Sequence, residues 1–316
     1  MRERSDFMLV EKYHPKTIDE CILPEHIKNT FQQFVNKGEI PNLLLAGPSG
    51  VGKTTIAKAL CYELGSDVYF INGSNEGRFL DTIRDNASTF ASTLSMTSGA
   101  KHKVIIIDEA DNTSADVQLL LRADMEKFQK NCRFIFTCNY KNKIIEALHS
   151  RCAVVDFSLK GNDKKQVANS FFYRLKEILE KERIEADPKV LAQLVAKHFP
   201  DLRRVLNEVQ RYSISGKIDS GILAAFSEIK IENLMKSLKA GNISEVRKWV
   251  VANSDNDTVA ILRKVYDTIF ATIDNPQSIG AAVLIIQKYQ YQSAFSMDQE
   301  ICLVSALTDL MIEVDF

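Results

Sequence analysis

Residues 47–54 read Gly-Pro-Ser-Gly-Val-Gly-Lys-Thr, which matches the pattern GxxxxGK[ST]. An apolar run at 42–46 precedes this loop, and residues 54–64 follow it with apolar side chains at helical spacing. Glycines allow backbone N–H groups to wrap round phosphates, and the N-terminus of a helix adds positive potential. We therefore expect a strand, a loop and a helix that bind a nucleotide through Gly50, Val51, Gly52, Lys53, Thr54 and Thr55. Lys53 is expected to reach the terminal phosphates, and the Thr54 hydroxyl is expected to bind Mg²⁺.

Four further apolar runs, at 68–71, 103–107, 133–138 and 153–157, are separated by amphipathic segments of helical length. Short apolar strands that alternate with helices predict a parallel sheet buried on both faces. After residue 157 the sequence becomes polar and rich in lysine, and helical patterns dominate from there on. We predict an α/β nucleotide-binding domain at 1–158, a first helical domain at 159–228 and a second helical domain at 229–316.

The composition sets limits on partners and location. The chain has 316 residues and a formal net charge of -1 at pH 7, which argues against the general phosphate affinity of a basic DNA-coating protein. Any DNA contacts are therefore expected to be local. The first residues lack the apolar core of a signal peptide, and no run reaches the roughly 18 apolar residues that a membrane span needs. The six cysteines show no paired CxxC spacing, and we expect a soluble cytoplasmic protein.

Acidic residues follow the apolar run at 103–107. Residues 104–111 read Val-Ile-Ile-Ile-Asp-Glu-Ala-Asp, which is typical of the Walker B strand that accompanies a phosphate-binding loop. Asp108 is expected to help hold the metal, while Glu109 is expected to polarise the attacking water. Another apolar strand ends in Asn139, which could orient water near the γ-phosphate. An asparagine after a strand is also a common turn former, which is the alternative interpretation of this residue.

The order of these motifs resembles the clamp-loader family of AAA+ ATPases, which includes replication factor C small subunits. Within that family the chain most resembles the ATPase subunit of tailed-bacteriophage clamp loaders. The matching stretches are the loop at 47–54, Asp-Glu-Ala-Asp at 108–111, Thr-Cys-Asn at 137–139, Ser-Arg-Cys at 150–152, Asp-Leu-Arg at 201–203, the opening Glu-Lys-Tyr-His-Pro-Lys-Thr at 11–17, Asn-Gly-Ser-Asn at 72–75 and the helix at 118–126. The resemblance is specific over 1–210 and rests on length and helical character beyond that.

The resemblance implies a RecA-like AAA+ domain, a helical lid and an all-α collar domain that oligomerises. It also assigns roles to particular residues. Lys53, Asp108 and Glu109 would act within the subunit, Asn139 would be the sensor 1 residue, and Arg203 would contact ATP from the lid as sensor 2. Arg151 would be the arginine finger inserted into a neighbouring site. Lys12, Tyr13 and Ile22 would belong to the adenine pocket.

Three positions depart from the family pattern. His14 replaces the usual arginine of the opening motif, Ala147 replaces a common proline, and Pro200 replaces a common glycine. None of the three removes a catalytic group, but His14 puts a phosphate contact by that position in doubt.

Family members hold primer–template DNA through its phosphates, without reading base sequence. By this resemblance, Arg84 matches a family DNA contact and Arg78 is a looser candidate. Lys141 and Lys143 are near a predicted helix start and could also reach a phosphate. A solvated surface charge remains an equal alternative for each of these residues. Gln118 and Arg122 are one helical turn apart, and we expect them to couple DNA or neighbour contacts to Glu109, although a buried interface pair would look the same.

The function implied is that of the ATPase subunit of a sliding-clamp loader. ATP and Mg²⁺ are the expected cofactors, and the expected partners are a sliding clamp, primer–template DNA and other loader subunits, including a non-ATPase subunit, in a pentameric ring. Other readings are a different AAA+ machine on DNA, such as a helicase loader or branch-migration motor, and a non-hydrolysing ring member. A small-molecule P-loop kinase is the weakest alternative, because no residue set suggests a phosphoryl acceptor site.

Overall fold

The computed structural model describes residues 8–74, 86–93, 102–213, 217–218, 231–254, 256–273 and 275–316. Its internal contacts divide the chain into unit 1, Met1–Ile222, and unit 2, Leu223–Phe316. The sequence-based boundaries at 158 and 228 remain predictions. No helix of the described residues is long and apolar enough to cross a membrane.

A parallel five-stranded sheet forms the centre of the first part of unit 1. Its strands lie in the order β2-β3-β4-β1-β5, with bounds β1 Leu43–Ala46, β2 Val68–Asn72, β3 Lys103–Asp108, β4 Cys132–Cys138 and β5 Ala153–Asp156. The predicted runs and the observed strands agree to within one or two residues. Ala46 is paired with Cys138, and Asn72 is paired with Asp108, so the carboxyl ends of these strands meet at one edge of the sheet.

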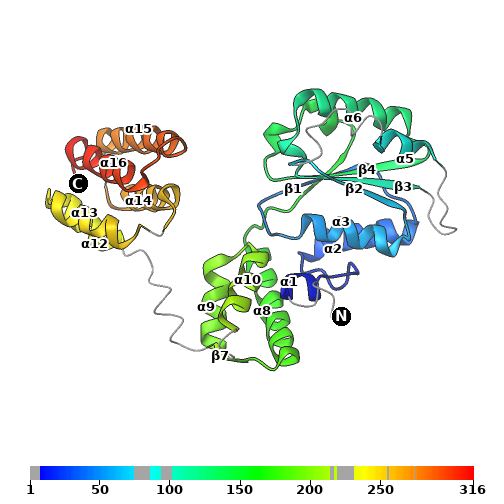
Figure 1. Cartoon of the computed structure of the whole chain (residues 1–316), viewed down its shortest axis with the longest axis horizontal. Coiled ribbons are helices and arrows are strands. Elements are labelled where there is room, and N and C mark those ends of the chain that lie inside the picture. The colour runs from blue at the N-terminus through cyan, green and yellow to red at the C-terminus, as the bar shows by residue number, and fades with distance from the viewer. Residues whose placement is uncertain are drawn as a thin grey trace. The chain divides into compact units, whose positions relative to one another are not determined.

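Helices cover both faces of this sheet, as the apolar runs predict. Figure 1 shows α2 (Glu25–Lys37) and α3 (Lys53–Glu63) on one face, and α5 (Ser88–Ser92) and α6 (Ala115–Lys127) on the other. Each face has its own apolar core, with Phe31 at the centre of one and Phe134 and Phe136 in the other. The described residues of this part also form shorter elements: α1 Leu9–Lys12, η3 Ala110–Asn112, η4 Lys141–Lys143 and α7 Glu146–His149.

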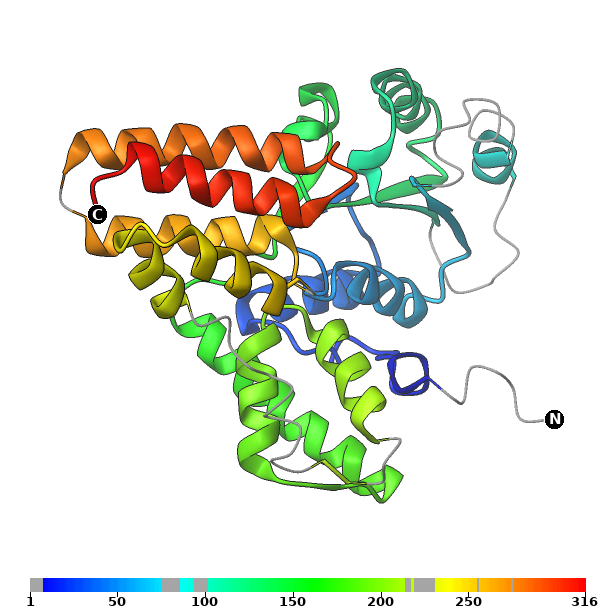
Figure 2. The same ribbon diagram turned by 60° about the vertical axis from the view of Figure 1, so that its left-hand side comes forward.

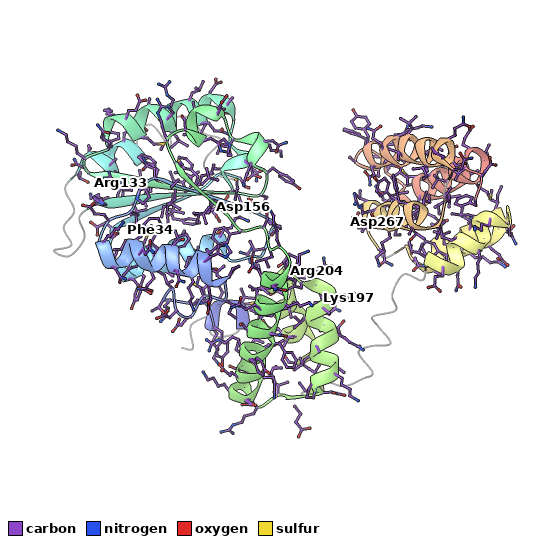
Figure 3. The ribbon with its side chains drawn as sticks, turned by 180° about the vertical axis from the view of Figure 1, so that it is seen from behind. Phe34, Arg133, Asp156, Lys197, Arg204 and Asp267 are labelled. Carbon is purple, nitrogen blue, oxygen red and sulfur yellow. The ribbon has the colours of Figure 1, made fainter. Side chains whose placement is uncertain are left out.

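The lid of unit 1 is helical, in agreement with the predicted change of character after residue 157. Its elements are α8 Asn162–Glu182, β6 Glu185–Ala186, α9 Pro188–His198, α10 Leu202–Ser213 and β7 Lys217–Ile218. The short parallel pair of β6 with β7 was not predicted, because two-residue strands leave no period in the sequence. Figure 3 places Lys197 and Arg204 on the lid helices α9 and α10. The α1 segment is tied to this lid, since the Leu9 N–H donates to Gln210 Oε1 at 3.0 Å.

The described part of unit 2 is helical, as predicted. Its helices are α12 Ile231–Lys239, α13 Ile243–Ala252, α14 Thr258–Thr272, α15 Pro276–Ser293 and α16 Gln299–Glu313. Figure 2 shows α15 and α16 side by side, in orange and red. Aspartate or asparagine caps begin α13, α14, α15 and α16, which satisfies backbone N–H groups that would otherwise lack partners. A single apolar core, with Leu262 and Leu307 fully buried, joins all five helices.

Candidate nucleotide site

The phosphate-binding loop joins β1 to α3 at the carboxyl edge of the sheet. Gly50 and Gly52 have φ angles of +74° and +95°, a left-handed region in which a side chain is strained. The loop lines a cavity of about 480 Å³ together with the start of α3, including Lys53, Thr54 and Thr55. Because the first N–H groups of α3 have no partner within the helix, this end of the cavity suits an anion. Val51 is buried in the core instead.

Lys53 is held at the base of the loop. Its Nζ donates to the carbonyl oxygens of Gly47 at 2.8 Å and Pro48 at 2.7 Å, and to Asn139 Oδ1 at 2.9 Å. Only 7% of Lys53 is exposed, and burial lowers the pKa of its ammonium group. The structure therefore brings together Lys53 and Asn139, which are far apart in sequence.

The Walker B carboxylate Asp108 lies between two hydroxyl groups. Thr54 Oγ1 donates to Asp108 Oδ1 at 2.5 Å, and Thr137 Oγ1 donates to the same oxygen at 2.6 Å. Thr137 also accepts the backbone N–H of Glu109 at 3.0 Å. Sequence reasoning did not include Thr137 in the site, although a threonine within the buried strand β4 is a signal that a partner is needed.

Glu109 has a left-handed backbone, with φ +53°, and its side chain borders the cavity. Its carboxylate accepts hydrogen bonds from Ser74 Oγ and, at 3.2 Å, from Asn112 Nδ2. Asn112 also donates to Ser74 Oγ at 2.9 Å. Ser74 and Asn112 were not predicted as site residues. Two neutral donors thus hold the Glu109 carboxylate in this structure.

Gly73 allows the end of β2 to approach the backbone of Asp108 and Glu109 closely. Its N–H donates to the Asp108 carbonyl oxygen at 2.7 Å, and a Cβ at this position would lie 2.5 Å from the Glu109 carbonyl oxygen. A residue with a side chain could not come so close.

Asp111 fixes the loop that carries Asn139. It is buried, and its Oδ2 accepts the N–H groups of Asn139 at 3.2 Å and Tyr140 at 3.1 Å. The Walker B segment and the residue predicted as sensor 1 are therefore joined directly.

The other end of the cavity is largely apolar. Tyr13 and Ile22 line it as the resemblance implied, with further apolar side chains that sequence reasoning did not single out: Met8, Val10, Leu23, Phe171, Ile178 and Leu206. The Tyr13 hydroxyl donates to Glu182 Oε1 at 2.5 Å. Burial and this hydrogen bond raise the pKa of Tyr13.

Lys12, which was predicted in the adenine pocket, pairs with the lid helix α8. Its side chain does not border the cavity, because its Nζ forms an ion pair with Glu182 at 2.6 Å. His14 does border the cavity and lies 3.4 Å from Thr55 Oγ1 through its Nε2 atom.

The lid meets the phosphate-binding loop at Gly50. The Leu202 N–H donates to the Gly50 carbonyl oxygen at 3.3 Å, and a Cβ on Gly50 would lie 1.9 Å from Asp201 Oδ1. This contact puts Arg203 at the wall of the cavity, where the sequence predicts a lid arginine. Two further polar lining residues, Arg174 and Asn207, were not predicted.

Arg151 lies outside the cavity of its own subunit, just before β5. Its guanidinium contacts Glu126 on α6, with Nε at 2.9 Å and Nη2 at 2.5 Å from Glu126 Oε1. Arg122 Nη2 contacts the same oxygen at 3.4 Å.

Gln118 is buried and connects α6 to η4. Its amide nitrogen donates to the Lys143 carbonyl oxygen at 3.1 Å, and its Oε1 accepts the Ile145 N–H at 2.8 Å. Lys141 on η4 pairs with Asp156 at 2.9 Å, and Figure 3 labels this aspartate at the end of β5. Hydrogen bonds from Ser158 and Lys141 lower the pKa of Asp156 to about 2.

The other two predicted DNA contacts, Arg78 and Arg84, lie outside the described residues.

The donor set fits a magnesium nucleotide. Within the described ranges, no three His, Cys, Asp or Glu side chains converge as a metal site. Mg²⁺ takes few protein ligands and completes its shell with phosphate oxygens and water. Thr54 and Asp108 supply one hydroxyl and one carboxylate that already touch each other, at the positions where such a cation would meet a phosphate chain on the loop.

Comparisons with known proteins identify the family of the chain. A family model for the ATPase family associated with various cellular activities matches residues 43–158, and one for the AAA+ ATPase lid domain of the sliding-clamp-loader large subunit matches residues 163–224. The sliding-clamp-loader large subunit of Enterobacteria phage T4 is 36% identical over 98% of this chain and 98% of its own length. Its counterpart in Escherichia phage RB69 is 40% identical over 77% of this chain and 76% of its own length. The replication factor C small subunit of Staphylothermus marinus is 35% identical over 85% of this chain and 83% of its own length.

Among solved structures, the Thermotoga maritima RuvB Holliday junction branch migration motor is similar in fold. It has a TM-score of 0.50 and 20% identity, over 81% of this chain and 79% of that one. This likeness concerns the fold alone, whereas the family models and the relatives match the chain in sequence. The family resemblance predicted from the motifs is confirmed, and the chain belongs to the sliding-clamp-loader family of AAA+ ATPases.

Proposed function

We propose that this clamp-loader ATPase binds Mg²⁺-ATP in the cavity of unit 1, with the adenine at the apolar end and the phosphates on the loop at 47–54. The observation that carries the proposal is the convergence of Lys53, Thr54 and Asp108 on one edge of the sheet, within hydrogen-bonding reach of each other or of the loop. Lys53 now contacts two loop carbonyls, and a triphosphate would offer its ammonium group a stronger, charged partner.

Within this site, Thr54 and Asp108 would hold Mg²⁺, which neutralises charge on the phosphates. Thr137 fixes Asp108 through its hydroxyl. Glu109 orients and polarises the attacking water, a role for which its carboxylate must leave Ser74 and Asn112. Asn139 and Arg203 contact the terminal phosphate, from β4 and from the lid.

Arg151 acts in a neighbouring subunit. It lies outside its own cavity and is held by its own α6, so in a ring it can present positive charge to the next nucleotide. The assembly would be a heteromeric pentamer that includes a non-ATPase subunit. The relatives' name, sliding-clamp-loader large subunit, supports a role in a multi-subunit complex that acts on a clamp and DNA.

Unit 2 is proposed to be the collar through which subunits associate. It carries several large apolar side chains that are exposed in the single chain, which supports burial against other subunits: Phe270, Leu284, Tyr291, Phe295, Met297, Ile301 and Ile312. Its cohesive helical core makes it a rigid element on which a ring can be built.

DNA is proposed to contact the ATPase domains through phosphates alone. Lys141, Lys143, Arg78 and Arg84 are the candidates. Lys141 is now paired with Asp156 and would exchange this carboxylate for a phosphate. Such binding would occur at replication forks, in the host cytoplasm if the chain is encoded by a phage.

Steady-state ATPase assays test this proposal. The protein is assayed alone and with primer–template DNA, the clamp and the accessory subunit, alongside Glu109→Gln and Arg151→Ala variants. We expect strong stimulation of the wild type by DNA and clamp, and loss of that stimulation in both variants with ATP binding retained. Equal activity of Arg151→Ala and wild type in the assembled complex would refute the trans role of Arg151.

A further inference from the structure

Glu126 on α6 forms an ion pair with one edge of the Arg151 guanidinium. Both Nε and Nη2 of Arg151 point at Glu126 Oε1, at 2.9 and 2.5 Å. The remaining nitrogen, Nη1, contacts the Ala147 carbonyl oxygen at 3.0 Å and Ser150 Oγ at 3.3 Å. These two oxygens are neutral groups of the segment that carries Arg151.

A guanidinium group can bind anions along two different edges, since its five N–H groups lie in one plane. Glu126 occupies the edge that contains Nε. The other edge, formed by Nη1 and Nη2, shares Nη2 with Glu126, but its Nη1 contacts only two neutral oxygens. A phosphate oxygen is a stronger partner for this N–H group than a carbonyl or a hydroxyl. The contacts of Arg151 thus leave Nη1 for a phosphate while the edge that contains Nε stays fixed.

Arg122 supports Glu126 from one helical turn earlier on the same helix, at 3.4 Å. Hydrogen bonding by Arg151 and the charge of Arg122 lower the pKa of Glu126, so this carboxylate is charged at neutral pH. Helix α6 begins after η3, which carries Asp111 and Asn112 of the Walker B region. Ser114 caps α6 by accepting the Val117 N–H. Glu126, the residue that binds Arg151, therefore lies on a helix that directly follows the segment forming the subunit's own nucleotide site.

We propose that Glu126 is a positioning residue for hydrolysis: it orients the guanidinium of Arg151 toward the nucleotide of the neighbouring subunit. The inference rests on the proposed trans role of Arg151 and adds to it the residue that sets the direction of the arginine. An exposed ion pair contributes little to stability, so the effect of Glu126 is expected in turnover.

The test uses the complete loader with clamp and primer–template DNA. Four variants are compared with the wild type: Glu126→Ala, Glu126→Gln, Arg151→Ala and the double variant Glu126→Ala/Arg151→Ala. Asp116→Asn is the matched control, because it removes one negative charge from an exposed position on the same helix. Thermal melting and ATP binding are measured on each assembled complex.

We expect Glu126→Ala to lower kcat by about 10- to 100-fold, the range that a misplaced catalytic group produces, with KM for ATP and thermal melting unchanged. Glu126→Gln, which keeps an oxygen but loses the charge, is expected to fall between Glu126→Ala and the wild type. Asp116→Asn is expected to match the wild type. In the Arg151→Ala background, Glu126→Ala should cause no further loss, because the residue acts through Arg151.

Three outcomes would overturn the inference, and they are distinguishable. If Arg151→Ala lowers kcat but Glu126→Ala does not, the trans role of Arg151 stands and Glu126 does not position it. If Arg151→Ala itself has wild-type kcat, the trans role fails and the inference fails with it. Additive losses in the double variant would likewise show that Glu126 acts on something other than Arg151.

Discussion

Substituting Gly50 by alanine should separate the lid from the phosphate-binding loop. The φ of Gly50 is +74°, and an added Cβ would lie 1.9 Å from Asp201 Oδ1 and 2.9 Å from Asp201 Cα. Rotation of the Asp201 side chain relieves only the first of these contacts. The second involves the backbone, so either the loop or the start of α10 must move.

The expected magnitude follows from two costs. A left-handed alanine costs roughly 1–2 kcal/mol, and overpacking of a tight contact adds about 1–3 kcal/mol. Together they predict a loss of about 2–5 kcal/mol, which for a unit of this size lowers Tm by about 4–20 °C. Movement of the lid also withdraws Arg203 from the cavity, so the Kd for ATP should rise about tenfold or more, which corresponds to at least 1.4 kcal/mol.

Gly65→Ala is the matched control for this prediction. Gly65 has φ +61°, and an added Cβ would meet nothing within 4 Å, so this variant carries the backbone strain without the clash. Urea denaturation and titration with a fluorescent ATP analogue would be measured for both variants. Gly65→Ala should lose about 1–2 kcal/mol and bind ATP like the wild type. Equal losses of stability in the two variants, with unchanged ATP affinity in Gly50→Ala, would refute the close contact between loop and lid.

Three further outcomes are expected. Thr137→Val removes the hydroxyl that donates to Asp108 and accepts the Glu109 N–H. We expect it to lower the free energy of unfolding, measured by urea denaturation, by about 1–3 kcal/mol, and to lower kcat. An unchanged free energy of unfolding together with an unchanged kcat would contradict this prediction. Gln118→Leu leaves the Ile145 N–H and the Lys143 carbonyl oxygen without their partner, and a loss of about 1–3 kcal/mol in the same assay is expected. The pKa of Asp156 is depressed from 3.8 to about 2, so its stabilising effect is complete above pH 3.8 and is lost as the pH falls toward about 2. NMR titration of its carboxyl group checks the value, and a midpoint near 3.8 would contradict the hydrogen bonds that Asp156 accepts from Ser158 and Lys141.

Much of the fold follows from the sequence because its strands are short, continuous apolar runs. The runs at 68–71 and 103–107 became β2 and β3 with one added residue each, Asn72 and Asp108. Both added residues are polar and lie at the site, so the apolar run ends one residue before the strand ends. The β6 and β7 pair was missed because its two-residue strands are stabilised by contacts distant in sequence.

The candidate site was predictable where a motif fixes the local backbone, as at Lys53 and Thr54. It was less predictable where side chains meet through the tertiary fold. Ser74 reaches Glu109 because β2 and β3 are neighbours, whereas Asn112 lies only three residues after Glu109 and reaches it within the turn of η3. For Lys12 the motif gives the position in the chain, while the direction of the side chain depends on its ion pair with Glu182 of α8.

The pairing of β1 with β5 has a consequence for the spacing of nucleotides in the proposed ring. The loop at 47–54 leaves the carboxyl end of β1, and Arg151 precedes the amino end of β5, which runs parallel to β1 from Leu43 beside Ala153 to Ala46 beside Asp156. In the proposed ring, the residues that one subunit would contribute to two successive ATP molecules would therefore lie at opposite ends of a hydrogen-bonded strand pair. The strand pair would keep these two sets of residues at a constant separation within the subunit, so the binding of each ATP would be expressed as a change in the angle between neighbouring subunits.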